Sequence, residues 1–421
     1  MNFFHRYALV AVLAVSAFSA SAQLGLADLL PIRRMAKAEG TSFQQSLEMA
    51  VRPAYIIQSH AYLRGDNPDS SAIRKSFSGH LKYGFKLPET SLANAVYRDA
   101  TQGIGIAAFT FSRPKEIGNP VALFAYQSAP IWNISNRLSL DYEWNFGASF
   151  GWKPYNPETN SAQHITGTKT NAYLNVSMLL NWRLSSHVGM NAGIAMTHFS
   201  NGNTGIPNTG LNTAALNVGI VYNFTPQITT AKSEEELPIP EFPRHISYDL
   251  VVFGSYCRSG ATYNDAAQMS PDRYPVVGFN FNPMYNVNYR FRAGASLDGT
   301  WDSSGGLQAV LTESGLCSIG GECTEDQFAF VRTDVSKQFS LGLSARLEYV
   351  MPFFSINAGI GHSLYAGDPK QRGLYQTLAL KTAITRNLFL HVGYRLHKFH
   401  EPNYLMIGFG YRFHNLFPRL R

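Results

Sequence analysis

Residues 188–200 read VGMNAGIAMTHFS and carry the pattern that decides the fold. The even positions hold large apolar side chains such as Met190 and Ile194, whereas odd positions hold small or polar ones such as Asn191. Alternation of this kind predicts a β-strand with one apolar and one polar face. Residues 212–224 repeat the pattern. A soluble, half-buried sheet would give the same alternation, so the composition must show what the apolar face meets.

The composition favours a membrane. Aromatic residues make up 13% of the chain and charged residues only 15%, against about 25% charged in typical soluble domains. Beyond the N-terminal segment, no uncharged apolar run reaches the ~20 residues that a membrane helix needs. These features are typical of a transmembrane antiparallel β-barrel, whose apolar side chains occupy alternate residues. The predicted fold class is therefore an all-β transmembrane barrel, with a secreted soluble β-protein as the alternative.

The N-terminus predicts export. Residues 1–22 have a basic start, an apolar stretch over 7–18 and small residues at 20–22, as a signal peptide does. The net charge of +7 is scattered through loops and turns rather than gathered in a stripe, so nucleic acid is not an expected partner. The predicted location is the outer membrane.

Sixteen strands are predicted in two sets of eight. The first set covers 53–64, 75–87, 102–112, 119–128, 136–150, 168–182, 188–200 and 212–224, and the second covers 246–258, 274–286, 288–302, 336–350, 353–365, 372–385, 387–400 and 404–413. The two sets end alike, in Tyr-Asn-Phe at 222–224 and Tyr-Arg-Phe at 411–413, which indicates an internal duplication. Tandem barrels and one large barrel both fit, and the long linker favours two barrels.

The expected organisation follows from these strands. Residues 23–52 form a periplasmic N-terminal segment, with a short helix within 26–50. Residues 53–224 form the first barrel, 225–244 an acidic and proline-rich linker, and 245–421 a second barrel-like half. With the N-terminus on the periplasmic side, strand 188–200 runs outward and ends at the cell surface.

The three cysteines give little more. Cys317 and Cys323 flank a short flexible segment that could close as a disulfide, whereas Cys257 has no evident partner. No metal site is predicted.

Three polar residues interrupt the apolar face. His198, Ser200 and Asn212 all occupy even positions, so the strand pair 188–200 and 212–224 can bring them together on the lipid-facing wall. Polar side chains facing lipid are costly and require a reason. Nucleophilic catalysis supplies one, with Ser200 as nucleophile and His198 as base. The structural alternative is ordinary, because such residues are common at a membrane interface.

A longer motif favours the catalytic explanation. Residues 197–202 (THFSNG) and 206–212 (IPNTGLN) resemble the signature of PagL-type lipid A 3-O-deacylases, or acyloxyacyl hydrolases, over about residues 50–224. The resemblance implies an eight-stranded outer-membrane barrel that removes an ester-linked acyl chain from lipid A, the lipid part of lipopolysaccharide in the outer leaflet, without a cofactor. It makes Ser200 the nucleophile and His198 the base. It also places Asn201 and the Gly202 backbone near the oxyanion, and matches Asn208 to a further polar position.

The motif departs from the family at one position. The family has a glutamate as third member of the triad, and the matching residue here is Asn212. Asparagine can orient a histidine, but it cannot stabilise an imidazolium by charge. Glu143 stands at an odd, lumen-facing position and is a poor substitute.

The second half lacks the motif. Aligning Gly193 with Gly393 places Lys398 at the position of His198 and His400 at that of Ser200, and the following loop shrinks to 401–403. This half is therefore predicted to be non-catalytic. The leading hypothesis is an outer-membrane esterase, and the alternative is a non-catalytic barrel with a structural or surface-interaction role. A pore ranks last, because an eight-stranded barrel is filled by its own side chains.

Overall fold

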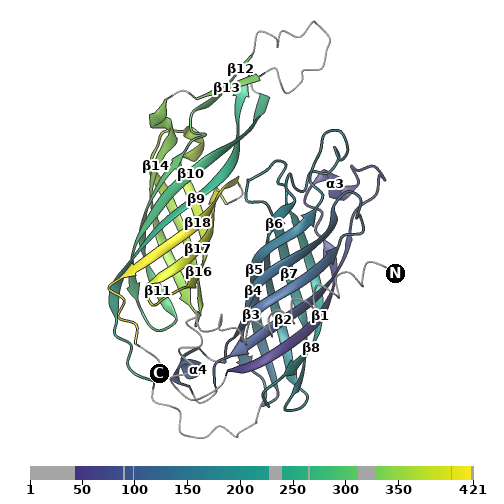
Figure 1. Ribbon diagram of the computed structural model, residues 1–421, viewed down its shortest axis with the longest axis vertical. Coiled ribbons are helices and arrows are strands. Elements are labelled where there is room, and N and C mark those ends of the chain that lie inside the picture. Colours follow the sequence, from purple (N-terminus) through teal and green to yellow (C-terminus); the bar gives the residue numbers. More distant parts are fainter. Residues whose placement is uncertain are drawn as a thin grey trace, which may run out of the picture.

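The chain forms two closed barrels, each of eight antiparallel strands, standing side by side (Figure 1). The computed structural model describes residues 43–418, except 89–90, 98, 227–238, 264–265, 312–327, 333 and 400. The all-β prediction and the preference for two barrels over one are confirmed. The predicted signal peptide, most of the linker, and Cys317 and Cys323 lie outside the described residues.

The first barrel closes by pairing its first strand with its last. Its strands are β1 (Gln44–Ile56), β2 (Lys75–Lys86), β3 (Thr101–Thr110), β4 (Gly118–Asn133), β5 (Leu138–Trp152), β6 (Thr170–Arg183), β7 (Val188–Ser200) and β8 (Leu211–Asn223). Two short helices, α3 (Ala61–Arg64) and α4 (Leu92–Tyr97), lie in its connections.

The second barrel closes by pairing β18 with β9. Its strands are β9 (His245–Tyr263), β10 (Ala266–Asn286), β11 (Phe291–Asp302), β14 (Phe339–Val350), β15 (Phe354–Ala366), β16 (Leu374–Ala383), β17 (Leu388–His397) and β18 (Glu401–Phe413). The strands β12 (Leu307–Leu311) and β13 (Phe328–Arg332) form a separate two-stranded sheet, and the 3-10 turns η4 (Val335–Gln338) and η5 (Pro369–Gln371) lie in the loops.

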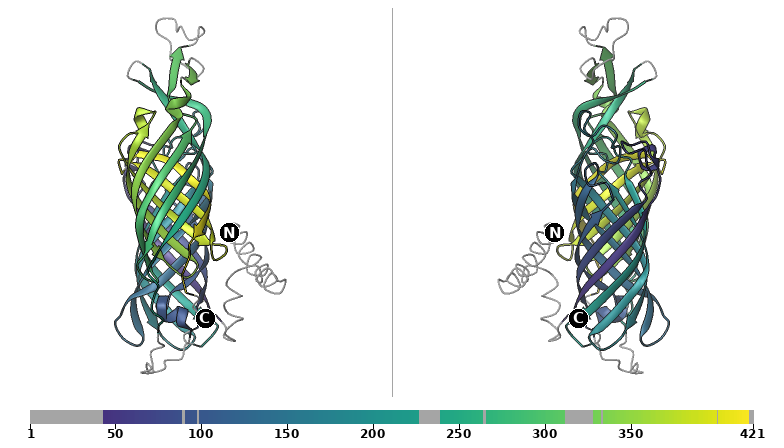
Figure 2. Two further views of the ribbon diagram at one scale, coloured as in Figure 1. Left: turned by 90° about the vertical axis from the view of Figure 1, so that its left-hand side faces the viewer. Right: turned by 90° about the vertical axis from the view of Figure 1, so that its right-hand side faces the viewer.

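The two ends of the barrels differ. One end, here the short-turn end, carries tight connections such as 134–137, 184–187 and 384–387. The other, the long-loop end, carries long ones such as 153–169 and 201–210. The strands are tilted in both barrels (Figure 2), as transmembrane barrels require. In bacterial outer-membrane barrels the long loops are extracellular, and β7 ends at this end.

The wall of each barrel follows the alternation of the sequence. On β7, Met190, Ile194 and Met196 point outward and are exposed, whereas Asn191 and Thr197 are buried in the lumen. No helix in the described part of the chain is long and apolar enough to cross a membrane.

Buried ion pairs fill the lumens. In the first barrel Glu143 bonds to Arg52 (3.1 Å) and Lys82 (2.5 Å). In the second, Arg292 bonds to Asp249 (3.0 Å) and Glu348 (2.7 Å). These networks bridge opposite sides of narrow barrels, so the pore hypothesis gains no support.

The first strand was misplaced by the sequence analysis. It was predicted at 53–64, but β1 begins at Gln44 and ends at Ile56. Residues 44–50, expected in a helix, therefore belong to the strand, and 26–42 lie outside the described residues. The β1 residues Glu48 and Arg52 face the lumen, where both are buried, so their charges are compatible with a membrane strand.

Strand ends differ elsewhere too. β9 reaches Tyr263 and β10 begins at Ala266, so this hairpin is longer than the predicted 246–258 and 274–286. Strand 387–400 instead ends at His397, because Lys398 and Phe399 adopt positive φ angles of 48° and 67°. The β12–β13 sheet and both helices were not predicted, since they lie in loops where no membrane periodicity applies.

Candidate active site

The site begins with a direct cross-strand pair at the long-loop end of the first barrel. His198 on β7 stands opposite Asn212 on β8 in the antiparallel register. The His198 Nδ1 atom lies 2.7 Å from Asn212 Oδ1. Because an amide oxygen only accepts, this bond has the Nδ1–H group donating, which leaves Nε2 as the basic nitrogen. Asparagine thus fixes the imidazole orientation that a catalytic base requires.

Ser200 lies two residues further along the same face of β7. It pairs with Ala172 on β6, and both Ser200 and His198 are half-buried and line the same cleft. Among the described residues no hydrogen bond joins the two side chains. In hydrolases without substrate such bonds are often long, and they tighten in the reacting complex.

Phe199, between the two, points to the other face and anchors the motif. It is fully buried, and its ring centroid lies 5.0 Å from that of Trp152 and 5.1 Å from that of Phe109. These rings belong to an apolar cluster that closes the lumen at the long-loop end. The His-Phe-Ser order therefore has a structural reason, because the aromatic residue holds the rim in place while its neighbours face outward.

The loop after β7 uses its asparagines to hold its own shape. The Asn201 backbone N–H donates to Asn208 Oδ1 (2.9 Å), and Asn201 Nδ2 donates to the Gly205 carbonyl (2.8 Å). Both asparagines line the cleft together with Gly202. The Gly202 N–H has no hydrogen-bond partner in the described part of the chain, and it is the free donor nearest to Ser200 in sequence.

Gly210 closes the loop against His198, and this role was not predicted. Its φ is +70°, and a Cβ atom there would lie 2.9 Å from the Phe199 carbonyl oxygen and 3.3 Å from His198 Cε1. A side chain at this position would press on the imidazole. The sequence signal was present, since the residue lies inside the quoted 206–212 motif, but alternation alone gave it no role.

A second histidine lies near this turn. Burial and the nearby His164 lower the pKa of His60 to about 4, so this ring is neutral near pH 7. It follows β1 in a loop, where an isolated histidine gives no signal in the sequence. Its neutral state keeps one positive charge away from the rim.

The side chains that line the cleft come from both barrels. The cleft has a volume of about 1120 Å³ and extends from His198 and Ser200 to β16, β17 and β18. Below it the barrels touch through an apolar cluster that includes Trp144, Met351 and Leu380. The site is therefore a cleft between two outer walls and not an open patch.

Glu143 is not part of the candidate site. Glu143 is buried in the lumen and bonded to Arg52 and Lys82, as its odd position predicted. Among the described residues no group of three or more histidine, cysteine or acidic side chains could hold a metal ion.

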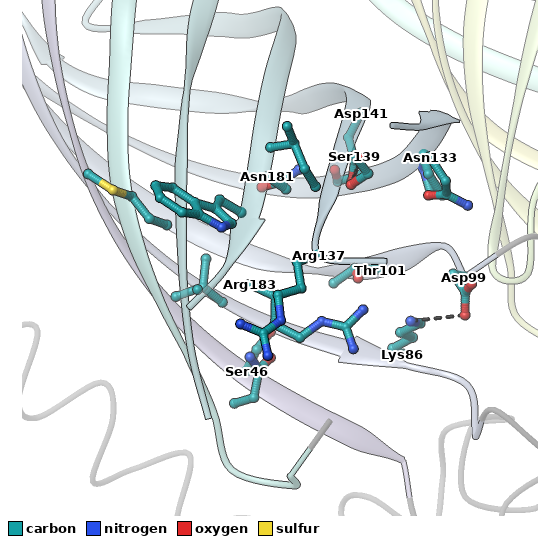
Figure 3. A pocket seen from close by; sticks show the side chains of 18 of the residues that line it. Ser46, Lys86, Asp99, Thr101, Asn133, Arg137, Ser139, Asp141, Asn181 and Arg183 are labelled. Carbon is teal, nitrogen blue, oxygen red and sulfur yellow. Dashed lines mark hydrogen bonds and ion pairs between the residues drawn. The ribbon is translucent and has the colours of Figure 1, made fainter. Parts of the chain in front are cut away.

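Another pocket lies at the short-turn end of the first barrel. It has a volume of about 220 Å³ and is lined by charged and polar side chains, including the ion pair of Lys86 and Asp99 (2.9 Å; Figure 3). Neither His198 nor Ser200 lines it. It lies at the barrel end opposite the candidate site.

Among the described residues, the second barrel shows no histidine at the position aligned with His198. β17 ends at His397, whose side chain is buried, and Lys398 lies in the turn with its Nζ 3.4 Å from Glu401 Oε1. His400, aligned with Ser200, lies outside the described residues.

The fold and the rim define a class, namely a transmembrane β-barrel with a serine and a histidine on its outer wall. Residues 79–221 match the family described as lipid A 3-O-deacylase (PagL), and residues 246–415 match the acyloxyacyl hydrolase C-terminal domain. The chain belongs to this PagL-type lipid A 3-O-deacylase and acyloxyacyl hydrolase family, with one domain of each kind in tandem.

Solved structures give more distant similarities. The outer membrane enzyme PagL is 11% identical, with 41% of this chain and 97% of that chain covered and a TM-score of 0.30. Neisserial surface protein A is 12% identical, with coverage of 43% and 97% and a TM-score of 0.26. The siderophore receptor PirA from Pseudomonas aeruginosa is 8% identical, with coverage of 88% and 81% and a TM-score of 0.26. No curated protein matches the chain.

Proposed function

We propose that this protein is an outer-membrane esterase that removes an ester-linked acyl chain from lipid A. The observation that carries the proposal is the 2.7 Å contact between His198 and Asn212, which orients the imidazole on the outer wall, beside a serine on the same face. A lipid ester reaches such a wall laterally through the bilayer. The two family matches support the substrate class.

The proposed reaction gives each of these groups a role. Ser200 Oγ attacks the acyl carbonyl carbon, and its proton passes to His198 Nε2. The ester bond breaks as His198 returns the proton to the departing sugar hydroxyl, which leaves an acyl-serine. Water, deprotonated by the same nitrogen, then attacks the acyl carbon. The bond to Ser200 Oγ breaks, His198 returns the proton to that oxygen, and the fatty acid leaves. No cofactor is required.

The oxyanion needs donors aimed at the developing charge. We assign this role to the Gly202 N–H. Asn201 and Asn208 support it by holding the loop, because their mutual hydrogen bond already uses the Asn201 N–H.

The test is mass spectrometry of lipid A from cells that express the wild-type protein or Ser200→Ala. We expect loss of one ester-linked acyl chain only with the wild type. Ser186→Ala, an exposed serine in the short turn between β6 and β7, is the matched control and keeps the activity. Identical lipid A from wild-type and Ser200→Ala cells, with both proteins inserted, would refute the proposal.

One observation favours a second candidate, a non-catalytic barrel with a structural or surface-interaction role. Asn212 carries no charge to stabilise the imidazolium that forms during acyl transfer. The same experiment separates the two candidates, since a non-catalytic barrel leaves lipid A unchanged.

A further inference from the structure

The second barrel forms one wall of the cleft that holds the catalytic pair. On the first barrel the cleft is lined by Phe146 and Leu174, and Leu174 stands opposite His198 in the strand register. Facing them are apolar side chains of the second barrel: Leu378 of β16, Val392 and Leu396 of β17, and Leu405 and Ile407 of β18. Leu378 and Ile407 are about half exposed, at 47% and 49%. Apolar walls on both sides suit hydrocarbon chains.

The nucleophile's loop is fixed to this second wall. Asn203 Nδ2 donates to the carbonyls of Asn403 (3.1 Å) and Arg258 (3.2 Å), and the Arg258 N–H donates to the Asn203 carbonyl (2.9 Å). The neighbouring Gly202 packs against Leu405, since a Cβ atom at 202 would lie 2.7 Å from its side chain. The position of the second barrel is thereby coupled to the residues that follow Ser200.

Cations stand at the mouth of the cleft. Lys169 of the first barrel and Arg273 of the second both line it and are exposed, and neither forms an ion pair with any described residue. Arg273 also stands directly opposite Arg258 in the β9–β10 register. Like charges opposite each other in a sheet are unfavourable, so this arrangement is suited to an anionic ligand. Phosphate groups match it well.

We propose that the second barrel is part of the substrate site. Its β16–β18 wall and the β5–β6 wall of the first barrel hold the acyl chains of lipid A between them, and Lys169 and Arg273 bind its phosphates. This inference rests on the proposed function for the choice of lipid, but it concerns binding and not catalysis. It gives the C-terminal domain a role that needs no catalytic residues of its own.

Photo-crosslinking tests the apolar wall. The full chain carrying Ser200→Ala, which keeps the lipid intact, is placed in phosphatidylcholine vesicles with a small fraction of lipid A. A photoreactive residue replaces Leu378 in the cleft or, as matched control, Leu343 on β14, which is 51% exposed on the outer wall but does not line the cleft. We expect lipid A to crosslink at least about fivefold more at 378. Equal yields at both positions, or phosphatidylcholine crosslinking at 378 in proportion to its abundance, would overturn the inference.

The cations are tested with the same probe at position 378. Dephosphorylated lipid A should crosslink about tenfold less than the phosphorylated lipid, since the absence of a charge-assisted hydrogen bond weakens binding by roughly that factor. Lys169→Ala/Arg273→Ala should abolish this preference, whereas Lys115→Ala/Arg332→Ala, two exposed cations outside the cleft, should keep it. A preference unchanged in the first double variant would remove the phosphate assignment.

The two proposals fail separately. Enriched crosslinking at position 378, together with no deacylation by the wild-type protein, would support the binding site and refute the esterase proposal. Deacylation with equal crosslinking at 378 and 343 would do the reverse.

Discussion

The hairpins β7–β8 and β17–β18 occupy the same place in the two barrels, and they differ at one end. Gly193 and Gly393 align, but β7 continues to Ser200, whereas β17 stops at His397. The longer strand includes His198 and Ser200 on its outer face, and the loop 201–210 follows it. In the second barrel a tight turn takes their place. Barrel closure needs none of these additions, so they require a functional explanation.

The interiors of the two barrels, unlike their rims, are similar. Each lumen holds a buried acid between basic side chains, Glu143 with Arg52 and Lys82 in one and Glu348 with Arg292 and Lys381 in the other. The lumen ion pairs, which both barrels share, serve folding. The end of β7, which differs from that of β17, is the region proposed to act on a substrate. Substitutions in the two regions should therefore differ widely in their effect on deacylation.

His198→Ala should have the largest effect, because it removes the base of the proposed reaction. Removing the base of a serine hydrolase lowers the rate by about 10⁴-fold or more. Fatty acid release from purified lipid A measures it. His187→Ala, at the short-turn end of the same strand pair, is the control and should keep wild-type activity. A loss of less than tenfold at 198 would mean that another group acts as the base.

Gly210→Ala should follow, because it puts a Cβ atom against His198 at a backbone conformation that alanine rarely adopts. A misplaced base costs about 10²-fold, measured as the same fatty acid release. Gly189→Ala, also at this hairpin, meets only ordinary contacts of 3.5 Å or more and should change little. Equal activity of the two variants would show that the loop does not position the histidine.

The site could be predicted from sequence to the extent that it lies on strands. Period-two alternation placed His198, Ser200 and Asn212 on one outward face, and the register and the contact between His198 and Asn212 agree. Alternation also placed Glu143 in the lumen. These predictions succeeded because a strand's side-chain direction is fixed by counting.

What lies in loops or between the barrels could not be predicted. The hydrogen bonds of Asn201 and the close approach of Gly210 to His198 depend on turn geometry that no periodicity encodes. The opposing wall with Leu405 depends on how the two barrels associate, and the alternation within each barrel contains no pattern for that association. The bounds of β1 were also missed, and its Glu48 and Arg52 have partners in the lumen that only closure of the barrel supplies.

Asn212→Glu should increase deacylation, since it restores the carboxylate that the family has at this position. A charged partner strengthens the bond to a forming imidazolium by about 1 kcal/mol over a neutral one, or roughly fivefold to tenfold in rate. Asn212→Leu, which keeps the size but removes the acceptor, should lower the rate by a similar factor. If both variants match the wild type, Asn212 does not orient the base, although it contacts it.

Glu143→Gln should affect deacylation least and stability most. It leaves Arg52 and Lys82 buried with less negative charge, which should lower the free energy of unfolding by about 3 kcal/mol, measured by urea unfolding in lipid vesicles. Glu348→Gln should do the same in the second barrel. The activity of folded protein should stay within about twofold in both variants, because these acids face the lumen and the catalytic pair faces the lipid. A loss of 10²-fold for Glu143→Gln alone, at equal folded yield, would connect lumen and rim and make the interiors as different in function as the rims.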